Sequence, residues 1–150
     1  MTSGYLLDSV DLKDTYGITV IKVSGIHDFL KRKGETGHNW LDEDGEEEYI
    51  ASSDIYFEPR DITLECILVG TSRNDFVVKI RQFKYALESP GLHTFKTPYF
   101  SSSYSVYFKD GGKVDILTAW NSHITAGKSR KHIAKFTITL REPNPIRAWI

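Results

Sequence analysis

Hydrophobic and polar residues alternate most regularly between residues 61 and 70. Ile62, Leu64, Cys66 and Leu68 fall on one side of an extended chain, and polar or charged residues separate most of them. Because the side chains of a strand point alternately to two faces, this pattern predicts a strand with one buried face. Such a strand needs a second element that covers its apolar side.

The period of the pattern changes directly after this strand. Apolar residues now recur every three or four positions, which is typical of a helix with one apolar face. Ser72 is suited to cap its start, and the Ser-Pro-Gly run at residues 89–91 ends it, so we expect a helix over residues 72–88. Its apolar face comprises Phe76, Val77, Ile80, Phe83 and Leu87.

The rest of the chain reads mainly as β-strand. Residues 1–15 form an N-terminal arm, irregular or with a short edge strand, and Asp110-Gly111-Gly112 predicts a tight hairpin turn between two strands. Alternating or β-branched runs predict further strands at residues 18–23, 92–95, 104–108, 114–118 and 133–141.

These elements predict a mainly β, α+β fold. About seven strands, most of them joined by hairpins or long loops, favour an antiparallel β-sandwich or small open barrel with one flanking helix. A length of 150 residues suits a single domain, and 40% hydrophobic and 13% aromatic residues exclude a disordered chain.

Residues 29–48 form the least ordinary segment. A basic cluster comes first and an acidic cluster last, with Trp40 between them, and the length exceeds that of an ordinary hairpin connection. We expect a protruding loop or long hairpin that turns near Asp44-Gly45, and clusters of opposite sign could join neighbouring subunits. The candidate interface residues are Lys31, Arg32, Lys33, Trp40, Asp42, Asp44, Glu46 and Glu47.

The composition supports no cofactor or metal site. The formal net charge is −1, from 19 basic and 20 acidic residues, so no global field attracts nucleic acid or an anionic membrane. An EF-hand loop beginning at Asp42 fails because Glu47 and Ser53 stand where glycine and glutamate are needed. A solvated acidic turn is expected there, with a calcium site of another kind as the alternative. The five histidines lack zinc-ligand spacing, and Cys66 is expected to be a buried, inert thiol. No nucleotide-binding or hydrolase motif is present, and a second basic cluster at residues 128–131 reads as solvated loop charge or a phosphate contact.

The N-terminal residues and the lengths of the apolar runs indicate where in the cell the protein is made. The N-terminus lacks the long apolar core of a signal peptide, and no run approaches the ~20 apolar residues that span a bilayer. We therefore expect a protein made in the cytoplasm.

The order of these segments resembles the N-terminal domain of phage distal tail (Dit) proteins and, more broadly, the phage tail-tube fold. The resemblance covers residues 16–97. It is carried by Y-G-I-T-V-I-K-V-S-G, by the long polar loop, by a strand that contains Arg60, Ile62, Thr63, Leu64 and Gly70, by a helix ending in L-E-S-P-G, and by L-H-T-F.

The resemblance implies a structural protein of a phage or prophage virion tail, without a cofactor, assembled in the host cytoplasm. Six copies would form a ring around a central channel, DNA would pass through without sequence-specific binding, and other tail or baseplate proteins would stack on the ring. The role could be that of a tube, distal-tail or tail-completion protein. Many distal tail proteins carry a second, carbohydrate-binding-like domain, for which 150 residues leave no room.

In such a ring, one face of the sheet packs the core and the other can line the channel. The candidate channel-facing residues are Thr63, Glu65, Lys135, Thr137 and Thr139, for which ordinary solvent exposure is the alternative.

A second function stays open: a small β-rich module that binds carbohydrate or peptide through exposed aromatics. The aromatics concerned are Trp40, Tyr99, Tyr107 and Trp120. For all of them except Trp40, burial in the core is the competing use. An enzyme would need a cleft in which several titratable groups converge.

Overall fold

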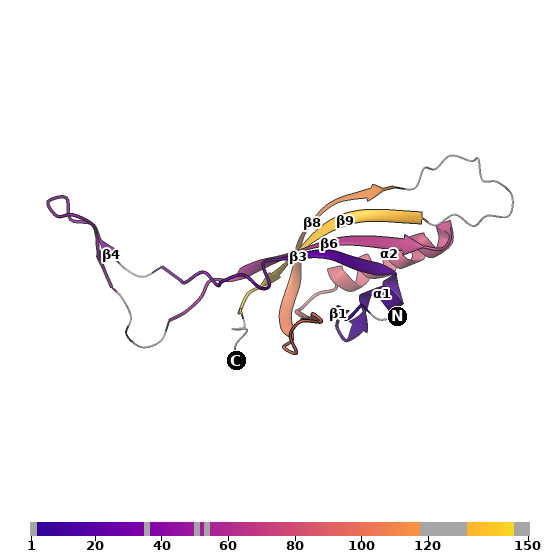
Figure 1. The fold of residues 1–150 in the computed structure, drawn as a ribbon, viewed down its shortest axis with the longest axis horizontal. Coiled ribbons are helices and arrows are strands. Elements are labelled where there is room, and N and C mark those ends of the chain that lie inside the picture. The colour runs from indigo at the N-terminus through magenta and orange to yellow at the C-terminus, as the bar shows by residue number, and fades with distance from the viewer. Residues whose placement is uncertain (1–2, 35–36, 50–51, 53–54, 118–131, 146–150) are drawn as a thin grey trace.

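A computed structural model describes residues 3–34, 37–49, 52, 55–117 and 132–145. Within them, seven strands form one antiparallel sheet in the order β2-β1-β7-β8-β9-β6-β3, and β4 pairs separately with β5 (Figure 1). The strands are β1 (Leu6–Leu7), β2 (Val10–Asp11), β3 (Ile18–Ser24), β4 (Gly37–His38), β5 (Glu47–Glu48), β6 (Arg60–Gly70), β7 (His93–Lys96), β8 (Tyr104–Ile116) and β9 (His132–Glu142). The helices are α1 (Leu12–Tyr16) and α2 (Arg73–Glu88).

The predicted class, a mainly β antiparallel fold with a flanking helix, is confirmed. The sheet is open rather than closed into a barrel, and the short helix α1 is an addition to the single helix expected.

Strands β6 and β9 form a long, unbroken ladder in the sheet. They pair over their whole length, from Arg60 opposite Glu142 to Gly70 opposite His132. Both alternate strictly between buried and more accessible residues, because one face of this pair packs against the helices. The buried face contains the predicted set Ile62, Leu64, Cys66 and Leu68, joined by Ala134, Phe136, Ile138 and Leu140.

Helix α2 covers this apolar face, and its bounds match the prediction. The Ser72 hydroxyl accepts a hydrogen bond from the Asp75 N–H at 3.2 Å, which caps the N-terminus. Near the middle of the core, the Phe83 ring lies 5.4 Å from that of Tyr16 and 5.9 Å from that of Phe136. The helix is therefore held to both α1 and β9 by aromatic contacts.

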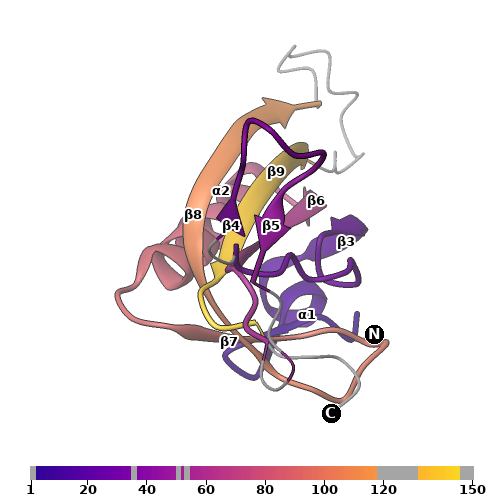
Figure 2. The same ribbon diagram turned by 90° about the vertical axis from the view of Figure 1, so that its left-hand side faces the viewer.

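The predicted hairpin at Asp110-Gly111-Gly112 is wrong. Strand β8 runs through these residues and pairs with β9 from Tyr107 to Ile116, with two register shifts on the way. Figure 2 shows β8 curving strongly along its length. Glycines inside a strand mark bulges as readily as turns. By continuing as a strand, β8 pairs its backbone with the edge of β9, and a tight turn at these residues would lose those hydrogen bonds.

The predicted N-terminal arm is largely ordered where the structure describes it. Strands β1 and β2 form a small hairpin whose turn residues, Asp8 and Ser9, have φ angles of 49° and 67°. The hairpin lies at the edge of the sheet because β1 pairs with β7.

A histidine–carboxylate pair fastens this hairpin to the sheet. The buried His93 imidazole places Nδ1 2.6 Å from Asp8 Oδ2 and Nε2 2.9 Å from the Ser89 carbonyl. Burial alone would lower the pKa of His93, but these two acceptors outweigh it and raise the pKa above its usual value. Burial would likewise raise the pKa of Asp8, and hydrogen bonds from the Thr94 N–H and His93 lower it instead.

Stability should therefore fall as the solution becomes alkaline. A raised folded-state pKa means that the His93 contribution is complete below the unfolded pKa of about 6.5 and is lost as pH rises through the folded value. The lowered pKa of Asp8 means that its contribution to stability is complete above the unfolded pKa of about 4 and is lost as pH falls through the folded value. Urea unfolding at a series of pH values should show this decline for the natural protein and not for His93→Asn; equal pH profiles would contradict it.

Candidate assembly surfaces

The segment between β3 and β6 is a two-stranded arm that projects from the body (Figure 1). Its stem is held by backbone hydrogen bonds: the Glu58 N–H donates to the Lys31 carbonyl at 2.7 Å, and the Lys33 N–H to the Tyr56 carbonyl at 2.9 Å. The Lys31 ammonium also lies 3.3 Å from the Glu58 carboxylate. The basic cluster therefore lies in the stem of the arm, near the body.

A buried ion pair fixes the base of the arm. The Arg60 guanidinium lies 3.0 Å from the fully buried Glu142 carboxylate and donates a second hydrogen bond to the Ile26 carbonyl at 3.1 Å. The guanidinium also lies 5.4 Å from the centre of the Tyr104 ring. One side chain thus links the turn after β3 from which the arm departs, at Ile26, to the sheet into which the arm returns.

The far part of the arm is acidic. Strands β4 and β5 pair His38 with Glu47, and the Trp40 indole donates a hydrogen bond to the Glu47 carboxylate at 2.9 Å. Gly45 turns the chain with a φ of 83°, close to the turn expected from the sequence. We call residues 40–48 the acidic tip: its exposed carboxylates are Asp42, Glu43, Asp44, Glu46, Glu47 and Glu48, and Leu41 is wholly exposed.

The arm separates the candidate interface residues into two groups. Lys31, Arg32 and Lys33 lie on the stem, whereas Trp40 and the acidic residues lie at the tip. The basic cluster and the acidic cluster therefore lie in different parts of the arm.

The five candidate channel-facing residues come together on one face of the sheet, opposite the helices. Thr63 lies opposite Thr139, and Glu65 opposite Thr137, while Lys135 is two positions from Thr137 along β9. We call this the outer face. The register of β6 against β9 makes it a continuous polar surface.

Charged side chains that the sequence did not single out extend the outer face. The Asp61 carboxylate lies 2.8 Å from the Lys109 ammonium and 3.6 Å from the Arg141 guanidinium. Lys109 lies at a register shift in the pairing of β8 with β9, and no pattern in the sequence predicts this shift. Arg141 and Asp61 are register partners and continue the alternation already recognised in β9 and β6.

Two strands longer than β2, the other end strand, have unpaired stretches. Among the described residues, β3 has a strand neighbour only on its β6 side. Strand β8 pairs with β7 only at residues 104–106, so the rest of β8 has β9 as its one strand neighbour. Unpaired strand edges offer rows of N–H and C=O groups to another chain.

No site for catalysis or metal binding stands out in the described part of the chain, where no group of three histidine, cysteine or acidic residues could hold a metal. Cys66 is fully buried, and burial raises the pKa of its thiol to about 12, so the predicted inert thiol is confirmed. His27 lies against aromatic rings and His38 against Trp40, while His123 falls outside the described residues.

Three of the four aromatics considered for ligand binding are accessible. Tyr99 is 76% exposed and meets the His27 ring edge-to-face at 5.7 Å, while Trp40 and Tyr107 are partly exposed. The competing interpretation of Tyr99 and Tyr107 as core residues is therefore wrong. Trp120 lies outside the described residues.

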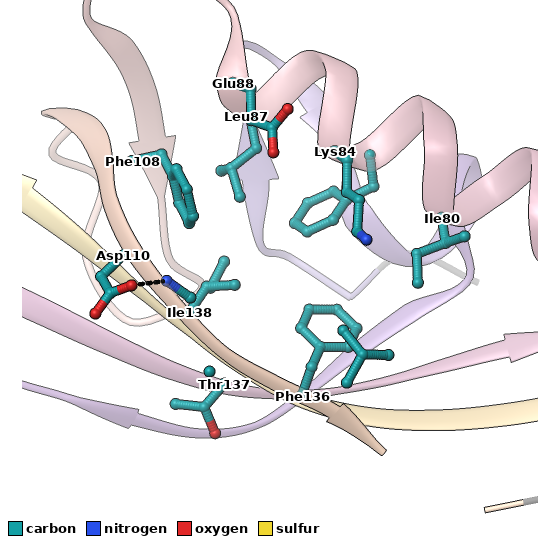
Figure 3. Close-up of a pocket in the computed structure, with 13 residues that line it drawn as sticks. Ile80, Lys84, Leu87, Glu88, Phe108, Asp110, Phe136, Thr137 and Ile138 are labelled. Atoms are coloured by element: carbon teal, nitrogen blue, oxygen red, sulfur yellow. Dashed lines mark hydrogen bonds between the residues drawn. The ribbon is translucent and has the colours of Figure 1, made fainter. Parts of the chain in front are cut away.

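An apolar cleft of about 310 Å³ separates α2 from β8 and β9 (Figure 3). Phe83, Phe136 and Ile138 contribute to its lining. Figure 3 shows Ile80 toward one end of the cleft and Phe108 with Asp110 toward the other, and Lys84 and Glu88 lie between them on α2. The Asp110 carboxylate accepts a hydrogen bond from the Gly111 N–H at 2.8 Å.

Comparison with known proteins identifies the fold. No protein-family model and no curated protein sequence matches the chain, and no described helix is long and apolar enough to cross a membrane. The fold is similar to that of the SPP1 Dit (gp 19.1) protein, whose crystal structure is described as a paradigm of the hub adsorption apparatus in phages that infect Gram-positive bacteria. The TM-score is 0.67 at 14% sequence identity, over 95% of this chain and 50% of that one. The chain therefore has a Dit-like fold and spans about half the length of the SPP1 protein.

Proposed function

We propose that this protein is a structural component of a phage or prophage tail, and that its copies join into a ring around the DNA channel. The ring, of six copies, would connect the tail tube to the distal tail or baseplate. The observation that carries the proposal is the Dit-like fold, which extends over 95% of the chain.

The two faces of the sheet support this function. The inner face is closed by α1 and α2, whereas the outer face carries threonines and charges of both signs, including Glu65, Lys135 and Arg141. A mixed polar surface can line water beside DNA without binding it tightly, because few phosphates would be neutralised. The unpaired stretches of β3 and β8 suit the joining of sheets from neighbouring copies.

The arm is suited to contacts between copies. It projects from the body and exposes the side chains of Phe29, Leu41 and Tyr49. Exposed apolar side chains of this size are typical of surfaces that contact another protein. A contact with a neighbouring copy or a stacked ring would bury these residues.

Deletion of residues 31–48 should yield a folded monomer. The central sheet and α2 lie outside the deleted segment, so circular dichroism and cooperative unfolding should remain, while contacts between copies are lost. Native mass spectrometry and light scattering of the natural and deleted proteins would measure the change. Closed rings formed by the deleted protein would refute the assignment of the arm as the joining element.

A second candidate function is a binding module for carbohydrate. It is favoured by the exposed Tyr99, which shares a shallow surface with Tyr5, His27 and Phe100. Glycan binding by a stable monomer would support this function over the ring.

A further inference from the structure

Helix α2 presents a basic surface to solvent. Its exposed residues include Arg81 and Lys84, and the Tyr85 ring is 80% exposed beside them. By contrast, Lys79 is engaged by Asp75 at 3.0 Å one turn away. We call the surface formed by Arg81, Lys84 and Tyr85 the basic face of α2.

The apolar cleft opens directly beside this basic face. Figure 3 shows Ile80 and Lys84 one turn apart on α2, with Phe136 beneath them. Glu88 lies one turn beyond Lys84 on α2, and Asp110 lies across the cleft on β8, so the negative charge lies on the side of Lys84 away from Ile80. An acidic ligand with one apolar side chain would therefore fit best beside Lys84, on the side toward Ile80, with Arg81 exposed nearby on the same helix.

The acidic tip of the arm has these properties. Its six carboxylates are accompanied by no lysine or arginine between residues 37 and 49, and the wholly exposed Leu41 directly precedes Asp42. Trp40 is held against Glu47, which fixes the direction of the chain entering Leu41. The tip therefore combines an apolar side chain with a dense negative charge.

The tip and the basic face are far apart within one copy. The arm leaves the body at the start of β6 and extends along the longest axis of the molecule away from α2 (Figure 1). We propose that the acidic tip of one copy docks on the basic face of α2 of a second copy, with Leu41 entering the apolar cleft. The partner of the arm is thus another copy of this chain, and the contact is head-to-tail.

This contact rests on the proposed role of the arm in joining copies and names the surface that receives it. A head-to-tail contact uses two different patches, so each copy keeps one tip and one receptor for further partners. Such contacts close into rings when the rotation between copies allows it.

Disulfide trapping tests the contact at any strength of assembly. Asp44→Cys protein mixed with Lys84→Cys protein should form a mixed dimer under mild oxidation in at least tenfold higher yield than with Lys13→Cys protein, in which the cysteine lies on the exposed surface of α1. Cys66 does not compete, because it is fully buried and its thiol has a pKa of about 12. Equal yields from Lys84→Cys and Lys13→Cys would overturn the proposal.

Charge exchange provides an independent test. Arg81→Glu with Lys84→Glu, or Asp42→Lys with Asp44→Lys, should each lower self-association in sedimentation velocity, and combining the four changes in one chain should restore it. If the arm deletion abolishes assembly and the α2 changes do not, the receptor is misassigned and the ring proposal stands. If the arm deletion leaves assembly intact, the role of the arm itself is wrong.

Discussion

Arg60→Met is expected to lower the free energy of unfolding by about 3–5 kcal/mol. The change leaves the fully buried Glu142 carboxylate without the guanidinium that lies 3.0 Å away, and it removes the hydrogen bond to the Ile26 carbonyl. A charge without its partner in a low-dielectric interior costs far more than the pair contributes. Chemical denaturation followed by circular dichroism would measure the difference.

The matched control replaces both partners. Arg60→Met combined with Glu142→Leu removes the stranded charge and should recover most of the lost stability, since apolar residues can replace a buried ion pair at little cost. A double variant as unstable as Arg60→Met, or a single variant within about 1 kcal/mol of the natural protein, would show that the pair is not the fastening of the arm.

Phe83→Ala should destabilise the protein by about 3–5 kcal/mol. The Phe83 side chain is 3% exposed and joins α2 to Tyr16 of α1 and Phe136 of β9, so its removal leaves a cavity beside the existing cleft. Thermal and urea unfolding would measure the loss.

Tyr85→Ala is the control on the same helix. Its ring is 80% exposed, so the same kind of truncation should change stability by no more than about 0.5 kcal/mol. Similar losses for the two variants would mean that α2 does not cover the sheet as described.

Regular patterns were predictable from the sequence wherever one face of an element is buried. The alternation in β6 and β9 and the helical period of α2 each report burial directly, and α2 begins within one residue of its expected start. The same alternation predicts the residues of the outer face, because the residues between buried positions share one side of the sheet.

Features that depend on distant partners were not predictable. Asp110-Gly111-Gly112 carries a strong turn signal, and only the presence of β9 alongside turns it into a bulged strand. Arg60 and Glu142 are 82 positions apart, and nothing local marks either as half of a buried pair. A long hairpin was among the expectations for the arm, but the register of its stem was not predictable, because residues 31–33 pair with residues 56–58 through the backbone, whatever their side chains.

The attachment of the arm has a mechanical consequence. Its returning strand continues into β6, which is paired with β3 on one side and β9 on the other. A pull on the arm along the direction of β6 would load these two ladders in shear, so many hydrogen bonds would resist together instead of opening one pair at a time. Tension arriving at the tip would thus be carried into the most continuous part of the sheet.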